Sequence, residues 1–220
     1  MVSIKSEIAS QIERVRDAVA SFQPVTIVAV TKFQPVEKIQ DALDCGLLNL
    51  GINHAQQGDD LKKALKDTQG LKLHFIGHIQ SRKAKSLTDY HLVQSLDRLL
   101  IVEEWKKHIP LKQSIEVLIE VNVGGEEQKS GILPGDLEEF IGKLKGHSFV
   151  RLRGLMAMPP FLEPPELRAP YFNKMRRLFE RFRDDTFNVL SMGTSSDYRI
   201  ALSEGSNMIR LGTTIFGKRM

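Results

Sequence analysis

Hydrophobic positions near the start of the chain follow two different periods. Between residues 3 and 21 an apolar side chain recurs every three or four residues, with polar side chains between. This spacing is typical of an amphipathic helix. Residues 25–32 instead form a largely apolar run with no charge until Lys32. Such a run predicts a strand that is covered on both faces, as in a parallel sheet.

The chain then repeats this alternation of strand and helix. After Lys32, Pro35 suits a first helical turn, an apolar stripe follows, and Gly46 suits the C-terminal cap. Seven more short apolar segments are predicted to be strands: 47–50, 71–76, 91–96, 115–123, 150–156, 188–192 and 207–211. Together these make eight strands, each followed by a helical candidate, and the order predicts an α/β fold, a (β/α)8 TIM barrel with an extra N-terminal helix. We see no linker and expect a single domain over residues 1–220.

One segment departs from the alternation. Residues 158–170 contain five prolines, too many for the interior of a helix or a strand. We therefore expect a long loop over the barrel mouth. The next segment, 171–183, has apolar residues on one face and arginines elsewhere. This pattern predicts an outer barrel helix rather than a membrane or RNA surface.

Composition excludes several classes of protein. Lys and Arg number 31 against 27 Asp and Glu, a formal net charge of +4, and the charges are interspersed. We expect neither a nucleic-acid nor a membrane partner. The single cysteine, Cys45, cannot form an intramolecular disulfide, and no N-terminal run resembles a signal peptide, so we expect a cytoplasmic protein. His74 and His78 have no Glu or Cys at ligand spacing, and we expect no metal site.

Lys32 stands where a barrel carries its chemistry. The carboxyl ends of the strands are where TIM barrels bind their ligands. Partial burial lowers the pKa of a lysine and so favours its free amine, which can condense with an aldehyde to form a Schiff base. Taken alone, the position also allows an ordinary surface lysine whose stem covers apolar surface.

The last two predicted strands run into small and hydroxyl-bearing residues, at 193–196 and 212–214. Glycine lets the backbone approach a ligand closely, hydroxyls donate hydrogen bonds, and N–H groups at helix starts bind anions. We predict a phosphate-binding cup here, because loops after the seventh and eighth strands of barrel enzymes commonly bind phosphate. Ordinary N-capping by Ser195 and Thr213 is the alternative.

Arg210 lies in the otherwise apolar eighth strand. A buried guanidinium needs a partner to offset its desolvation, and the sequence leaves open a ligand or a buried carboxylate. Closure of the barrel makes the first and eighth strands neighbours, so Lys32 would face the phosphate-binding cup. A phosphorylated aldehyde would fit both groups.

Seven short motifs resemble those of one protein family. They are 28–32 (VAVTK), 75–81 (FIGHIQS), 121–123 (VNV), 129–131 (KSG), 153–156 (RGLM), 190–193 (LSMG) and 209–213 (IRLGT). In these motifs the chain resembles the pyridoxal phosphate homeostasis proteins, which share the alanine-racemase-like barrel of fold type III. The resemblance extends over nearly the whole chain.

The resemblance implies a cofactor and its contacts. The cofactor is pyridoxal 5′-phosphate (PLP), held as a Schiff base on Lys32. Ser195, Gly212 and Thr213 hold its phosphate, and Arg210 faces its pyridine nitrogen. The resemblance also implies that five further residues contact the cofactor: Asn53, His78, Asn122, Met156 and Ser191.

The chain departs from the family pattern around the first half of the mouth. Ile52 and His54 replace a glutamate and a tyrosine, and Gln57 replaces a second glutamate. Further departures are Arg82 for asparagine, Thr194 for methionine and Ser196 for glycine. The lysine and the cup are kept, so we expect cofactor binding, with the loss of two carboxylates altering cofactor exchange or partner choice.

Two functions are compatible with these residues: a non-catalytic carrier that buffers and delivers PLP, and a PLP-dependent amino-acid racemase. An arginine cannot accept the pyridinium proton, so a pyridine nitrogen that faces Arg210 stays unprotonated. The unprotonated ring is a poorer electron sink for catalysis. The racemases that the barrel resembles take a second acid–base group, a tyrosine, from an added β-domain of the partner subunit. The chain reaches Met220 directly after the eighth strand–helix unit, so we expect no such domain. We favour the carrier and expect a monomer, with PLP-dependent apoenzymes and small amino acids as partners besides PLP.

Overall fold

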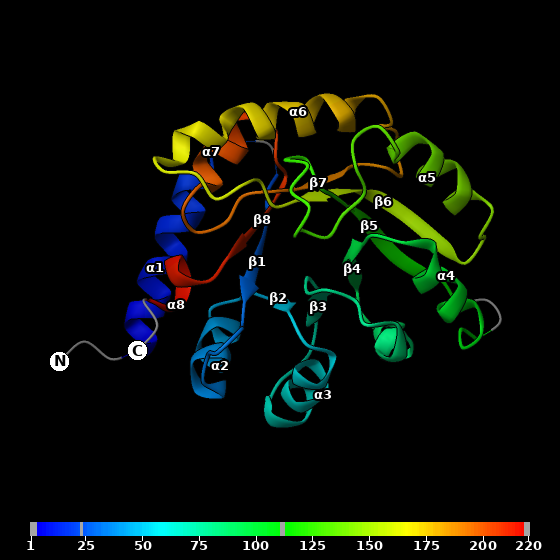
Figure 1. Cartoon of the computed structure of the whole chain (residues 1–220). Helices are drawn as coiled ribbons and strands as arrows, with labels where there is room; N and C mark the ends of the chain where they lie inside the picture. Colours follow the sequence, from blue (N-terminus) through cyan, green and yellow to red (C-terminus); the bar gives the residue numbers. More distant parts are fainter. Residues whose placement is uncertain (1–3, 23, 111–112, 218–220) are drawn as a thin grey trace.

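Eight parallel strands close into a barrel in the order of the chain. In this computed structural model, which describes residues 4–22, 24–110 and 113–217, each strand pairs with the next and β8 pairs with β1. The strands are β1 (Thr26–Val30), β2 (Asn49–Ile52), β3 (Lys72–Phe75), β4 (Leu92–Leu96), β5 (Ile115–Val121), β6 (Val150–Ala157), β7 (Val189–Ser191) and β8 (Met208–Leu211). The predicted TIM barrel and its eight strands are confirmed (Figure 1).

Helices cover the outside of the strands (Figure 1). The α-helices are α1 (Ile4–Val19), α2 (Val36–Asp44), α3 (Ala55–Ala64), α4 (Leu99–Lys106), α5 (Leu137–Lys145), α6 (Ala169–Glu180), α7 (Tyr198–Ser203) and α8 (Thr213–Phe216). Two segments are 3-10 helices, η1 (Ser81–Leu87) and η2 (Pro165–Arg168). The predicted N-terminal helix is α1, although residue 3 lies outside the described residues; α1 packs against α2 and α8.

Most predicted strand boundaries differ from the observed ones by one or two residues. Strand β2 begins and ends two residues later than predicted, because the strand continues through Gly51. A Cβ atom at Gly51 would lie 3.0 Å from the side chain of Ile76 and 3.1 Å from that of Val28, so only glycine fits this crowded interior position. In the proline-rich segment, Pro165 begins η2 and Pro170 lies in the first turn of α6, where a missing N–H breaks no helical bond.

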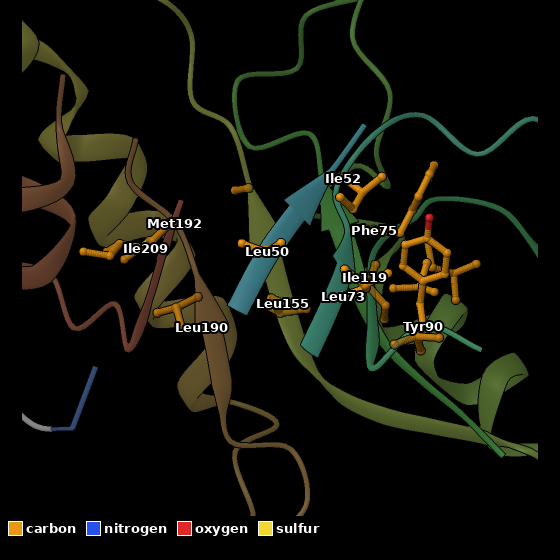
Figure 2. Close-up of a cluster of buried hydrophobic side chains, with 14 of the residues drawn as sticks. Leu50, Ile52, Leu73, Phe75, Tyr90, Ile119, Leu155, Leu190, Met192 and Ile209 are labelled. Carbon is orange, nitrogen blue, oxygen red and sulfur yellow. The ribbon is translucent and has the colours of Figure 1, made fainter. Parts of the chain in front are cut away.

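Side chains alternate along each strand between two packing layers. The outer layer, between the strands and the helices, is apolar and includes Leu50, Leu155 and Ile209 (Figure 2). A separate, smaller cluster of buried residues comprises Val28, Leu92, Leu118, Met156 and Met208. These five belong to the opposite strand face and form an apolar layer inside the barrel, beneath the strand ends.

The chain between β6 and η2 lies over the carboxyl ends of the strands, as the prolines predicted. Met158 lines the cavity described below, and Lys129 of the loop after β5 donates a 3.0 Å hydrogen bond from Nζ to the carbonyl oxygen of Pro159. The prolines therefore keep this segment irregular where it borders the mouth. Among the residues that the structure describes, no helix is long and apolar enough to cross a membrane.

Candidate functional site

A cavity of about 520 Å³ lies at the carboxyl ends of the strands. Its lining residues are Val30, Lys32, Asn53, Ile76, Met158, Thr194, Ser195, Ser196, Arg210, Gly212 and Thr213. Six of the ten sequence-predicted site residues are among them: Lys32, Asn53, Ser195, Arg210, Gly212 and Thr213. The volume is in the range of small-molecule sites, and the lining combines apolar side chains with a few polar groups.

Lys32 follows the end of β1 by two residues and is half-buried in the cavity wall. Thr31 anchors the backbone before it, because its N–H and its hydroxyl both donate to the carbonyl oxygen of Gly51, at 3.1 and 3.2 Å. The backbone after it adopts a left-handed conformation at Phe33, with a φ of 63°, and the Lys32 Nζ lies 4.9 Å from the centre of the Phe33 ring. The backbone before Lys32 is therefore anchored, and the half-buried lysine lines the cavity.

Gln57, one of the departures from the family pattern, supports the same strand end. Its Nε2 donates to the carbonyl oxygen of Thr31 at 3.1 Å and to the Thr31 hydroxyl oxygen at 3.2 Å. An ionised glutamate has no proton to donate to a carbonyl oxygen. The amide at this position therefore ties α3 to the residue before Lys32.

The residues of the predicted phosphate-binding cup lie together where the turns after β7 and β8 meet. Ser195 Oγ accepts hydrogen bonds from the backbone N–H groups of Gly212 and Thr214, at 3.1 and 3.2 Å. The N-caps of α7 and α8 are Asp197 and Gly212 rather than the predicted Ser195 and Thr213, although Ser195 does cap the turn into α8 from the neighbouring loop. Because Oγ already accepts two bonds, the Ser195 hydroxyl proton can be donated to a ligand.

Two observations bear on whether a ligand fits this cavity. A Cβ atom at Gly212 would come no closer than 3.7 Å to Val30, so packing does not require glycine there. A side chain would instead enter the cavity. The Oδ1 atom of Asn53, a cavity-lining residue, is buried without a hydrogen-bond partner. A buried amide oxygen without a donor is costly, and a polar ligand would supply the donor.

Arg210 is buried, at 4% exposure, and its contacts are neutral groups. Its Nη1 donates to the carbonyl oxygen of Ser191 at 3.0 Å and to the Ser191 hydroxyl at 2.6 Å, and its Nη2 donates to the carbonyl oxygen of Ala157 at 2.9 Å. Burial lowers the pKa of Arg210 to about 10, while the carboxylates of Glu120 and Asp197 act in the opposite direction. The guanidinium therefore stays charged at neutral pH without a direct carboxylate contact.

Glu120 of β5 shares the electrostatic environment of Arg210. Burial and the nearby Asp97 raise the pKa of Glu120 to about 7, against the opposite effect of Arg210 and Lys129. The Glu120 carboxyl group therefore changes charge near neutral pH.

Sequence reasoning missed Arg168, which joins the mouth segment to the phosphate-binding cup. Its guanidinium is 3% exposed and donates at 2.8 Å both to the Asp197 carboxylate and to the Ser196 hydroxyl. It also donates twice to the carbonyl oxygen of Leu162, at 3.1 and 2.9 Å. Asp197 in turn accepts from the backbone N–H of Thr194 at 2.6 Å. No local pattern marks Arg168, because its buried carboxylate partner, Asp197, lies 29 residues further along the chain.

The other four predicted site residues do not line the cavity. His78 is exposed and lies 3.0 Å from the Ser130 hydroxyl. Asn122 uses its amide within its own loop, donating to the carbonyl oxygens of residues 126 and 129. Met156 belongs to the inner apolar layer, two residues before the cavity-lining Met158. Ser191 contacts Arg210, which itself lines the cavity.

The remaining family departures divide into two groups. Ile52 is buried in the outer apolar layer, whereas His54 and Arg82 are exposed, so none of the three lines the cavity. Thr194 and Ser196 do line it, beside Ser195. The departures that reach the cavity are thus confined to the turn after β7.

The fold and the cavity define a barrel of the alanine racemase N-terminal domain class, whose family model matches residues 5–220. More narrowly, the chain belongs to the pyridoxal phosphate homeostasis protein family. A member from Aquifex aeolicus is 40% identical over 200 residues, which cover 88% of this chain and 86% of that protein. The structure of PipY from Synechococcus elongatus, solved with PLP bound, superposes with a TM-score of 0.84 at 27% identity, covering 96% of this chain and all of PipY.

Alanine racemase shares the fold more distantly. The enzyme from Oenococcus oeni superposes with a TM-score of 0.72 at 20% identity and covers 97% of this chain. The match spans 62% of the racemase. The likeness therefore lies in the barrel, and the racemase has a further part that the match does not include.

Proposed function

We propose that this chain, as a single domain, binds pyridoxal 5′-phosphate in the cavity and serves as a non-catalytic carrier in PLP homeostasis. One observation carries the proposal: Lys32, Ser195 and Thr213 line one cavity. They come from β1, β7 and β8, which barrel closure brings side by side (Figure 1). The names of the relatives and the PLP bound to PipY support the same ligand.

The proposal gives each lining residue a task. Lys32 would hold the cofactor covalently, its amine and the cofactor aldehyde forming a Schiff base and releasing water. The hydroxyl of Ser195, with Thr213, would donate to the phosphate, and Gly212 would leave room for it. Asn53 would find the donor that its Oδ1 lacks, and Arg210 would donate to the ring nitrogen.

The cavity lining favours the carrier over the racemase. No tyrosine is among the described residues that line the cavity, so a second acid–base group opposite Lys32 has no evident source there. Tyr90 is instead buried among the outer apolar residues and donates to the carbonyl oxygen of Ala55 at 3.4 Å. Recipient apoenzymes, small amino acids, a monomeric state and a cytoplasmic location complete this proposal.

Borohydride reduction tests the proposal. Protein incubated with PLP should absorb visible light, and borohydride should remove that band and fix the cofactor to the peptide that contains Lys32. Lys32→Ala should give no fixed cofactor. Lys83→Ala, which removes an exposed lysine outside the cavity, is the matched control and should behave as the unaltered protein.

Two results would change the assignment. Fixation at Lys83, Lys85 or Lys129 would refute Lys32 as the attachment site. Conversion of L-alanine to D-alanine by loaded protein at an ordinary enzymatic rate, about 1 s⁻¹ or faster, would replace the carrier with the racemase. Transfer of the cofactor to a PLP-dependent apoenzyme, with little racemisation, is the result that we expect.

A further inference from the structure

A chain of buried polar side chains crosses the barrel interior from Arg210 to Asn49. Ser191 Oγ lies 2.6 Å from Arg210 Nη1 and 2.7 Å from Gln94 Oε1. Gln94 Nε2 lies 3.1 Å from His74 Nδ1, and His74 Nε2 lies 3.0 Å from Asn49 Oδ1. Arg210, Ser191, Gln94 and His74 are each at most 4% exposed. The chain thus starts at the cavity and runs toward the amino ends of the strands.

The hydrogen bonds in this chain run in one direction, away from Arg210. A guanidinium only donates, so the Ser191 hydroxyl accepts from it and donates its own proton to Gln94 Oε1. The Gln94 amide then donates to His74 Nδ1, which leaves the imidazole proton on Nε2, where it is donated to Asn49 Oδ1. Reversing one bond would place two donors or two acceptors face to face.

His74 can accept from Gln94 and donate to Asn49 at neutral pH only if its imidazole is uncharged. Burial, together with the neighbouring His91 and Lys72, lowers the pKa of His74 to about 3. The imidazole is therefore neutral at neutral pH, and its Nδ1 is available as an acceptor.

The chain leaves one edge of the Arg210 guanidinium for a ligand. Both N–H groups of Nη1 are used by Ser191, and one N–H of Nη2 is used by the carbonyl oxygen of Ala157. Among the residues that the structure describes, none accepts from the Nε–H or from the second N–H of Nη2. The Nε–H lies on the edge of the planar group that also carries an N–H of Nη2, and Arg210 lines the cavity.

We propose that Ser191, Gln94 and His74 are positioning residues, which hold Arg210 with its free edge toward the ring nitrogen of the bound cofactor. The inference rests on the proposed function, since it requires PLP in the cavity. An arginine side chain has several rotatable bonds, and the surrounding inner layer, with Val28 and Met208, is apolar. The hydrogen-bond chain therefore supplies the directional contacts that apolar packing cannot.

The proposal is tested by comparing PLP with its analogue in which a carbon atom replaces the ring nitrogen. The unaltered protein should bind PLP about tenfold or more tightly than the analogue, as expected for one hydrogen bond from a charged donor. Ser191→Ala and Gln94→Leu should reduce this preference to below about threefold. Ser206→Ala is the matched control, because Ser206 is as buried as Ser191 but donates to carbonyl oxygens of β7, β8 and the turn between them.

Each outcome separates the two proposals. Failure of the unaltered protein to bind either compound would refute the proposed function. Binding of both compounds with equal affinity would refute the role of Arg210 at the ring nitrogen and leave the cofactor site standing. An unchanged preference in folded Ser191→Ala and Gln94→Leu would refute the positioning role.

A second measurement needs no cofactor and does not depend on those variants folding. Nitrogen-15 NMR of the cofactor-free protein should show a neutral His74 with its proton on Nε2. In Gln94→Glu the carboxylate still accepts from Ser191 but cannot donate to Nδ1, so the imidazole proton should move to Nδ1 or His74 should become charged. A His74 with its proton on Nδ1 in the unaltered protein would overturn the direction of the chain and the proposal with it.

Discussion

Replacing Arg168 with methionine would remove the guanidinium that joins the mouth segment to the turn after β7. Methionine keeps much of the length and apolar volume of the side chain. It leaves the Asp197 carboxylate, itself 4% exposed, with the N–H and hydroxyl of Thr194 as donors but without its counter-charge. It also leaves the carbonyl oxygen of Leu162 without two donors.

The expected cost follows from this burial. Breaking a buried ion pair by removing one partner costs about 3 to 5 kcal/mol, because the remaining charge stays buried and unpaired. With a denaturant slope of about 2 to 3 kcal/mol per molar urea, the unfolding midpoint should fall by about 1 to 2.5 M. Cofactor binding should weaken as well, because Arg168 also contacts the Ser196 hydroxyl in the cavity wall.

Arg181→Met supplies the control for this prediction. Arg181 pairs with Glu138 at 2.9 Å, nearly the distance of the Arg168 pair, but its side chain is 55% exposed and that of Glu138 is 73% exposed. Such surface pairs contribute about 0 to 1 kcal/mol. Urea unfolding followed by circular dichroism measures both variants. Equal costs for the two, both below about 1 kcal/mol, would refute the argument that burial makes the Arg168 pair matter.

Two further predictions concern the cavity. Ser195→Ala combined with Thr213→Val should weaken PLP binding more than about a hundredfold, since each removes a donor to a charged oxygen; an equilibrium titration that finds an unchanged dissociation constant would exclude the phosphate-binding cup. Because burial raises the pKa of Glu120 to about 7 from an ordinary value of 4.5, the folded protein retains a proton there that the unfolded chain loses. The free energy of unfolding should therefore fall by up to about 3 kcal/mol as the pH rises from about 4.5 to 7. Glu120→Gln has no carboxyl group to titrate and should not show this fall. Urea midpoints measured across this pH range would contradict the reasoning if the two proteins gave parallel curves.

The sequence by itself determined the elements and their order. Strands covered on both faces leave apolar runs, and outer helices leave an apolar stripe, so both are visible in short windows of sequence. The same windows place Lys32 just past the end of β1 and Ser195, Gly212 and Thr213 just past β7 and β8. Because parallel strands in a barrel all point one way, these residues had to meet at one end.

The tertiary structure decided which residue of each strand reaches the cavity. Met158 lines it while Met156 lies in the inner apolar layer, and Arg210 lines it while Ser191 supports Arg210 from below. The two methionines are two residues apart, so the period of two by itself cannot separate them, although β6 ends at Ala157, between them. The position of each residue along the barrel axis depends on the register of all eight strands in the closed barrel. A short sequence segment contains no information about that register. For the same reason the ion pair between Arg168 and Asp197 had no sequence signal: its two halves come together only once the barrel has closed.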